Sequence, residues 1–409
     1  MRIIHTADWH IGQKLAGYGR DYEHAAVLNQ LADIVRDREA DALLVSGDVF
    51  DHQNPSGEAQ QVFYSALLKL KKARPAMAII VTAGNHDAAG RLEAPRALLA
   101  SMNVHIVGNV RRSIGCIDAS RHFMTLNNAA GDAAARVLAV SYPTPACLPA
   151  LAAQASATRC STGALYDEMM VAGGTEFADL PLIVMGHLHV AGGLETEGSE
   201  RKILIAGQQA VPPDVFPAQA AYVALGHLHK AQWIGRKTIR YSGSLIPLSA
   251  SEITYQHGVT LLTFDGISPV PVIEHIPVVR PVEFLRVPSD REIVLDELGD
   301  HLKALALDPK LPVERWPFVQ VWLSWDDRGK RAEADRIGAE FPVRLIEPKI
   351  SKPARAAEQL PLAEPSVRLA EINPEDLFHK AFARRHGKPP EVAHIEAFQF
   401  AAHAAASED

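Results

Sequence analysis

Five short polar segments of this chain each follow an apolar run, and they carry side chains that bind metal ions. They are Asp8-Trp9-His10, Gly47-Asp48-Val49-Phe50-Asp51, Gly84-Asn85-His86-Asp87, Gly186-His187 and Gly226-His227-Leu228-His229. Carboxylate, amide and imidazole donors without thiolate suit manganese, iron or zinc better than calcium or magnesium. No single segment would support a metal site, but their order and placement predict the shell of a two-metal hydrolytic site.

The second and third segments contain residues of different expected roles. Asp48 is the candidate bridge, because the two oxygens of a carboxylate can join two cations about 3.5 to 4 Å apart. Asn85 offers an amide oxygen as a neutral ligand, whereas His86 should point elsewhere and serve as a general acid toward a leaving oxygen. Asp51 is expected to orient a histidine or another ligand, and Asp87 could fix the tautomer of His86.

The first and last segments are expected to place their residues by strand alternation. Asp8 and His10 are two residues apart at the exit of the first predicted strand, so both side chains should point the same way. The same alternation should bring His227 and His229 to the metals together.

One ambiguity remains in the fourth segment. His187 and His189 have the same local spacing, so the residues alone leave open which of them is the ligand. Either choice leaves the predicted chemistry unchanged. Two cations with a bridging carboxylate can activate a water molecule and neutralise phosphate oxygens during in-line displacement, which predicts phosphoester hydrolysis.

The elements that must position these residues alternate along residues 1–278. Apolar runs at 40–46, 77–83, 136–141, 180–185 and 221–225 predict strands that are covered on both faces. Helical spacing of apolar residues predicts helices at 21–39 and 58–73. This order indicates a layered α/β domain whose site lies at the carboxyl ends of its strands.

The pattern changes near residue 279. Strands at 281–287, 318–324 and 343–346 alternate with helices at 289–307 and 330–341, which predicts a compact β-α-β-α-β unit over 279–350. The first of these helices should open at Ser289 or Asp290. Residues 351–371 read as a linker, and residues 372–409 as two short amphipathic helices that bury their apolar faces on their own chain or, as we favour, on a partner.

Composition limits the kind of protein and its partners. The chain has 409 residues and a formal net charge of −7, which argues against a broadly basic surface for nucleic acid. Local patches, bound cations or a partner would have to attract DNA. Three cysteines without a close pair indicate neither a disulfide framework nor a zinc ribbon. The absence of a signal peptide and of a long apolar run predicts a cytoplasmic location.

These residues in this order resemble the calcineurin-like metallophosphoesterase family. The sequence around them is similar to that of one branch of the family, the bacterial SbcD nucleases, in the segments 5–12, 46–51, 84–87, 185–189, 222–230 and 241–244. The resemblance covers most of the chain. It implies a four-layer sandwich of two mixed sheets flanked by helices, with a small α+β capping domain at 279–350 that helps to shape DNA access, and C-terminal helices.

The resemblance also implies roles for the site residues. One metal would be held by Asp8, His10, Asp48 and His229, and the other by Asp48, Asn85, His187 and His227. His86 would be catalytic. In the family only the first histidine of the earlier Gly-His motif is a ligand, so His187 would bind the metal. His189, like Asp51 and Asp87, would support the ligands without binding a metal itself. The implied metals are two manganese ions.

The function implied by this resemblance is that of a manganese-dependent DNA nuclease subunit. It would act as an ATP-dependent exonuclease on duplex DNA and as an endonuclease on single strands or hairpins, in DNA repair, recombination and replication. Its partner would be an SbcC-like coiled-coil ATPase, bound by the C-terminal helices, with the nuclease as a homodimer within a heterotetramer. Residues 52 and 53 fall where members vary, so preferences for substrate geometry are not transferable.

Two other interpretations compete with this one. A metallophosphoesterase for small phosphodiesters or phosphomonoesters explains the site equally well but leaves residues 279–409 without a purpose. A non-enzymatic scaffold on the same fold predicts lost ligands, and none of the expected ligands is missing from the sequence.

Overall fold

The computed structural model describes residues 1–113, 116–149, 160–174, 179–196 and 210–350, together with five isolated positions after residue 381. Residues 1–351 form one compact unit and residues 352–409 a second one. The linker predicted at 351–371 and the helices predicted at 372–409 lie outside the described residues, apart from those isolated positions. Within the described ranges, no helix has the length and apolar character needed to cross a membrane.

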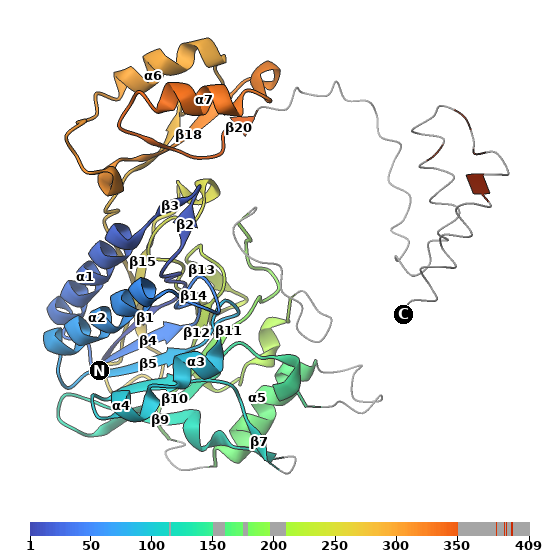
Figure 1. The fold of residues 1–409 in the computed structure, drawn as a ribbon. Helices are drawn as coiled ribbons and strands as arrows, with labels where there is room; N and C mark the ends of the chain where they lie inside the picture. The colour runs from blue at the N-terminus through green and yellow to red at the C-terminus, as the bar shows by residue number, and fades with distance from the viewer. Residues whose placement is uncertain are drawn as a thin grey trace. The chain divides into compact units, whose positions relative to one another are not determined.

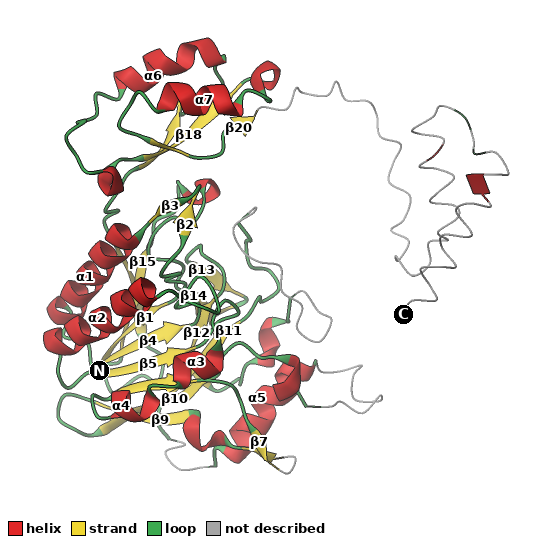
Figure 2. Cartoon of the chain, viewed as in Figure 1, coloured by secondary structure: helices red, strands yellow, loops and turns green. Residues whose placement is uncertain are grey.

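Two mixed sheets of six strands each form the body of the first unit (Figures 1 and 2). The first has the order β16-β15-β1-β4-β5-β6. Strands β1, β4, β5 and β6 are parallel, β15 pairs antiparallel with β1, and β16 pairs antiparallel with β15. Its strands are β1 (Arg2–Thr6), β4 (Ala42–Ser46), β5 (Ala78–Thr82), β6 (Val104–Val107), β15 (Gly258–Thr263) and β16 (Val272–Pro277).

The second sheet has the order β13-β14-β12-β11-β10-β9, with four parallel central strands and an antiparallel strand at each edge. Its strands are β9 (Phe123–Asn127), β10 (Ala133–Ala139), β11 (Leu182–His187), β12 (Ala220–Gly226), β13 (Gln232–Ile234) and β14 (Arg236–Tyr241). All five strands expected from apolar runs are present, and each lies in the parallel part of one of the two sheets.

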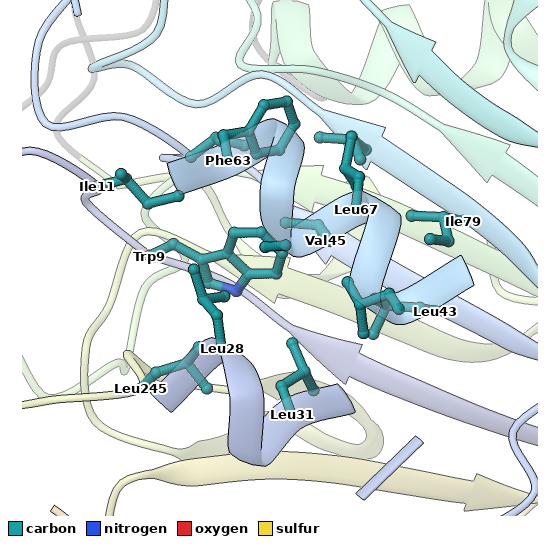
Figure 3. Packing of buried hydrophobic residues seen from close by; sticks show 14 of the residues in the cluster. Trp9, Ile11, Leu28, Leu31, Leu43, Val45, Phe63, Leu67, Ile79 and Leu245 are labelled. Atoms are coloured by element: carbon teal, nitrogen blue, oxygen red, sulfur yellow. The ribbon is translucent and has the colours of Figure 1, made fainter. Parts of the chain in front are cut away.

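Helices cover the outer face of each sheet. On the first sheet, α1 (Asp21–Asp37) and α2 (Gly57–Ala73) bury Leu31 and Phe63 against Leu43 and Ile79 (Figure 3). Helix α2 begins after Ser56, whose hydroxyl accepts a hydrogen bond from the amide of Ala59. On the second sheet, α5 (Ser161–Ala172) packs over the strands through a separate apolar core.

The inner faces of the two sheets pack on each other. Their shared core includes Leu44 and Ile80 from the first sheet and Val137, Ile183 and Tyr222 from the second. The order helix, sheet, sheet, helix confirms the four-layer sandwich of two mixed sheets flanked by helices. The remaining short elements are β2 (Lys14–Leu15), β3 (Tyr18–Gly19), α3 (Ala89–Glu93), α4 (Arg96–Ala100), β7 (Arg112–Ser113) and β8 (Cys116–Ile117).

A third, parallel sheet follows in the chain and is called the capping sheet below. It consists of β17 (Phe284–Val287), β18 (Phe318–Leu323), β19 (Arg344–Leu345) and β20 (Lys349–Ile350). Alternate residues of β18, Val319, Val321 and Leu323, pack against α6 (Leu298–Ala304) and α7 (Arg331–Gly338). The order of elements is the one expected over 279–350, although the boundaries of a separate domain stay a prediction.

The helix expected from residue 289 begins later than predicted. A 3-10 turn at Leu295–Glu297 precedes α6, and residues 289–294 are not helical. The amide of Ile293 donates to the carbonyl of Trp322 at 3.0 Å, and the amide of Ser324 donates to the carbonyl of Ile293 at 2.9 Å. This pairing with the end of β18 outweighs the local helical spacing.

The capping sheet packs on the two-sheet body through an apolar cluster. Its members are Val282, Phe284, Phe318 and Ile346 from the capping side and Leu15, Tyr18, Ala250 and Ile253 from the body. A buried ionic group lies beside them. The guanidinium of Arg344 lies 3.7 Å from the ring centroid of Phe318, and one of its nitrogens lies 3.7 Å from Glu23, which also pairs with Arg20 at 2.7 Å.

We expect Phe318→Ala to lower the free energy of unfolding by about 3 to 5 kcal/mol, because it removes a fully buried ring from this cluster. Urea unfolding of the full-length protein would measure the change. Val313→Ala, at a position that is 50% exposed, is the control and should change stability by less than about 0.5 kcal/mol. Equal effects of the two substitutions would contradict the assignment of Phe318 to the core of this contact.

Candidate metal centre

The backbone that carries the predicted ligands leaves the strands in an uncommon conformation. Four of the predicted ligands have positive φ, namely Asp8 at 53°, His10 at 45°, Asp48 at 49° and His227 at 106°. Few non-glycine residues adopt this region, and each case costs on the order of 1 to 3 kcal/mol. Such strain persists only where the surrounding structure imposes it, and it is typical of functional sites.

The strand alternation predicted for these side chains is wrong, although they do converge. Strand β1 ends at Thr6 and β12 ends at Gly226, so Asp8, His10 and His229 lie beyond the extended backbone and do not alternate along a strand. The convergence results from tight turns after the strand ends. The amide of Asp8 donates to the carbonyl of Gly47 at 3.1 Å, which joins the first two of these turns.

Asp48 lies between histidines from two other segments. Its Oδ2 is 3.3 Å from Nε2 of His187 and 3.5 Å from Nε2 of His10, and its Oδ1 accepts a hydrogen bond from the amide of His86 at 2.9 Å. Burial alone would raise the pKa of the Asp48 carboxyl, but His187, His10 and His86 together hold that pKa well below its usual value. The carboxylate therefore stays ionised, as a bridging ligand must.

Most of the other predicted ligands gather around this carboxylate. Ligand atoms lie within 4.8 Å of one another in three groups: Asp8 with His10 and His229, His10 with Asp48 and His86, and Asp8 with Asp48 and His187. The amide oxygen of Asn85 lies 3.0 Å from Nε2 of His187. Residues from all five polar segments thus meet at one end of the two sheets.

His227 and His189 lie at one side of these groups. The ring centroid of His227 is 5.6 Å from that of His187, and its amide donates to Oδ1 of Asp8 at 2.9 Å. The ring centroid of His189 is 6.1 Å from that of His227, and its Nδ1 lies 3.3 Å from a carboxylate oxygen of Glu195. Neither His227 nor His189 belongs to the three ligand groups found among the described residues.

Asp87 binds backbone amides of two turns, which is a different role from the one expected. Its carboxylate accepts hydrogen bonds from the amides of Val49, Phe50 and Gly84 at 3.1, 2.9 and 2.8 Å, so it joins two of the turns. The Nδ1 of His86 lies 2.8 Å from the carbonyl oxygen of Asp51, which can only accept a hydrogen bond. That carbonyl, and not Asp87, favours the tautomer of His86 with a proton on Nδ1.

The donor set fits divalent cations. Oδ2 of Asp8 and Nε2 of His10 are buried and have no hydrogen-bond partner, although buried polar atoms in proteins almost always have one. Such atoms cost free energy unless something else satisfies them. Carboxylate, amide and imidazole donors around two orphaned atoms are what a mixed nitrogen and oxygen site for manganese, iron or zinc requires.

Three of the histidines are oriented by acceptors at Nδ1. That atom lies 3.0 Å from Oδ1 of Asp51 in His10, 2.9 Å from the carbonyl of Ser46 in His187, and 2.9 Å from Oε1 of Glu252 in His229. With Nδ1 engaged, Nε2 is the atom available to a metal. Glu252 was not predicted from the sequence, because an isolated glutamate 23 residues after His229 carries no local signal.

The amino-terminal part of the chain matches the calcineurin-like phosphoesterase family over residues 1–129. A protein of Rhodobacter capsulatus described as the SbcD component of the nuclease SbcCD is 45% identical over 389 residues, covering 93% of this chain and 94% of that protein. A protein of Bacillus subtilis with the same description is 38% identical, over 64% of this chain and 66% of its own length. One from Escherichia coli K12 is 27% identical, over 94% of this chain and 93% of its own length. The first and third likenesses thus span nearly the whole chain.

The glycines before the ligands allow their close approach. A Cβ on Gly84 would lie 2.0 Å from Oδ1 of Asp48, and a Cβ on Gly47 would lie 2.3 Å from Nδ1 of His187. We expect Gly84→Ala to displace Asp48 and to weaken the binding of divalent cations by about 10- to 100-fold, with the fold retained. Calorimetric titration of the metal-free protein with Mn²⁺ would measure the loss.

Gly90→Ala is the matched control for Gly84→Ala. It makes the same substitution six residues later, where an added Cβ would meet nothing within 4 Å. Manganese binding should be unchanged in this variant. Unaltered binding in Gly84→Ala as well would show that the approach of Gly84 to Asp48 is not required for the metal site.

Proposed function

Because this chain belongs to the SbcD family of nucleases, within the calcineurin-like phosphoesterases, we propose that it is the manganese-dependent DNA nuclease subunit of an SbcC-SbcD type complex. It is a phosphodiester hydrolase. The observation that carries the finer proposal is the buried carboxylate of Asp48, held between His10 and His187 beside the orphaned oxygen of Asp8.

The proposed metal ligands form two sets that share Asp48. One set is Asp8, His10, Asp48 and His229, and the other is Asp48, Asn85, His187 and His227. The contact of His189 Nδ1 with Glu195 at 3.3 Å supports the exclusion of His189 from both sets. Two bound divalent cations would supply an activated water molecule and would neutralise the phosphate oxygens.

His86 is proposed as the general acid. Its amide is fixed by Asp48 and its Nδ1 by the carbonyl of Asp51, and its side chain is only partly buried. When the ring is protonated, the proton on Nε2 is the one that can be passed to the leaving oxygen of a cleaved phosphodiester. Since His86 also fits a ligand group with His10 and Asp48, its role needs a test that separates metal binding from catalysis.

The proposed substrate is DNA. The protein would act on duplex ends as an ATP-dependent exonuclease and on single strands and hairpins as an endonuclease, in DNA repair, recombination and replication. Because the net charge is −7, local basic patches, bound cations or a partner would have to supply the attraction for DNA. We propose an SbcC-like coiled-coil ATPase as the partner, bound through residues 372–409. The nuclease would form a homodimer within a heterotetramer. Its proposed location is the cytoplasm.

We expect His86→Ala to abolish manganese-dependent cleavage of linear duplex DNA while leaving the binding of two Mn²⁺ ions intact. Asp48→Ala should abolish both cleavage and the binding of at least one ion, because the shared carboxylate is lost. Nuclease assays with the ATPase partner present, together with calorimetric Mn²⁺ titrations, would measure the two properties.

The control for these variants is His301→Ala, a histidine on α6 away from the centre, which should leave both properties unchanged. Retained DNA cleavage in Asp48→Ala would overturn the assignment of the site. Rapid hydrolysis of a small aryl phosphodiester without cleavage of DNA in the wild-type complex would favour the small-substrate interpretation instead.

The partner proposal has its own test. Leu377→Asp with Phe378→Asp places two charges on the apolar side of the first predicted C-terminal helix, so we expect the variant to lose co-purification with a co-expressed coiled-coil ATPase. Manganese binding should be retained. Lys380→Ala, on the polar side of the same predicted helix, is the control. A doubly substituted protein that still co-purifies would place the partner surface elsewhere.

A further inference from the structure

Glu252 is a fully buried carboxylate that connects a proposed metal ligand to the backbone of its own loop. Its Oε1 lies 2.9 Å from Nδ1 of His229, and its Oε2 accepts a hydrogen bond from the amide of Leu248 at 2.9 Å. The residue is 0% exposed. It belongs to the 3-10 turn Ala250–Glu252, which follows His229 by about twenty residues in the chain.

A carboxylate is the side chain suited to this position. Each of its two oxygens receives one N–H group, so both must be acceptors. A glutamine has one acceptor oxygen and one NH₂ group, and would leave either His229 or Leu248 facing a donor. A carboxylate at Nδ1 also fixes the tautomer of the histidine and makes Nε2 a more basic metal ligand.

The loop around Glu252, residues 247–255, is held from the body of the protein. The buried guanidinium of Arg20 donates to the carbonyl of Pro247 at 2.7 Å, and the side-chain amide of Gln13 donates to the carbonyl of Leu248 at 3.0 Å. These contacts fix the start of the loop next to α1.

The same loop is held from the capping side. Arg286 of β17 donates to the carbonyl of Ala250 at 3.3 Å, and Arg280 donates to the carbonyl of Tyr255 at 3.0 Å. Ala250 and Ile253 pack against the apolar cluster that includes Phe284 and Phe318. Glu252 therefore lies between two points at which capping residues contact its loop.

We propose that Glu252 is a positioning residue for His229. Through the loop 247–255, the affinity of the metal site that contains His229 would then depend on how the capping sheet packs against this loop. This inference rests on the proposed two-metal function and adds a physical link between the centre and the part of the chain that follows residue 279. A capping sheet that is loosened or displaced would release the carbonyls of the loop, and with them the orientation of His229.

The test is calorimetric titration of the metal-free full-length protein with Mn²⁺, with thermal unfolding of the same samples. We expect Glu252→Gln to weaken one of the two sites by about 10- to 100-fold and to leave the other within a factor of about two. Glu274→Gln, on the exposed ion pair with Arg38, is the matched control and should bind both ions as the wild type does.

Arg286→Ala tests the link to the capping sheet, and it decides the proposal if Glu252→Gln does not fold. It should weaken the same site by about two- to tenfold, the range that the loss of one hydrogen bond spans. Arg291→Ala removes the same charge from an exposed ion pair with Glu297 and should have no effect.

The outcomes separate this inference from the proposed function. Wild-type protein that binds no Mn²⁺ would overturn the two-metal function itself. Wild-type binding of two ions, with both sites unchanged in Glu252→Gln and Arg286→Ala, would overturn only the positioning role. Equal weakening of both sites, together with a lowered unfolding temperature, would show that Glu252 supports the fold and does not position His229.

Discussion

The ionised carboxylate of Asp48, buried between two histidines, is the group on which the rest of the structure depends. An isolated buried charge is costly in an apolar interior, and it is tolerated only where charges and hydrogen bonds compensate it. His10 and His187 approach its Oδ2 from opposite sheets, and the amide of His86 binds its Oδ1. The two sheets must therefore end at one point, with their polar strand ends in contact.

Several features of the fold follow from that requirement. The hydroxyl of Ser46 donates to the carbonyl of Ala224, and the hydroxyl of Ser242 donates to the carbonyl of His5, so the strand ends of the two sheets are hydrogen-bonded to each other. The positive φ of Asp8, His10 and Asp48 adds strain on the order of several kcal/mol. Three apolar cores, one between the sheets and one on each outer face, are large enough to offset it.

The sequence predicted much of this arrangement, because apolar periodicity reports which faces of strands and helices are buried. The strands near 42–46 and 78–82 and the helix over 21–37 lie within two residues of their predicted bounds. Local patterns failed where distant residues decide the outcome. Residues 289–294 pair with the end of β18 and do not form a helix, and Asp8 and His10 converge through turns whose φ values no strand pattern predicts. Glu252 reaches His229 only through the folded loop.

The distribution of cationic side chains bears on how an acidic chain could handle a polyanion. Arg20 and Arg344 are buried at the contact with the capping sheet, where they serve the fold. Several arginines nearer the surface are paired with carboxylates, as Arg38 is with Glu274 and Arg112 with Glu168. Paired cations attract phosphate weakly, because the neighbouring acid cancels much of their field. Attraction for a DNA backbone would then come from local patches of unpaired cations, from bound metal ions or from a partner surface. A centre that becomes attractive to phosphate only when its metal ligands are correctly oriented would make the loops that hold His10 and His229 as important for substrate binding as for the chemical step.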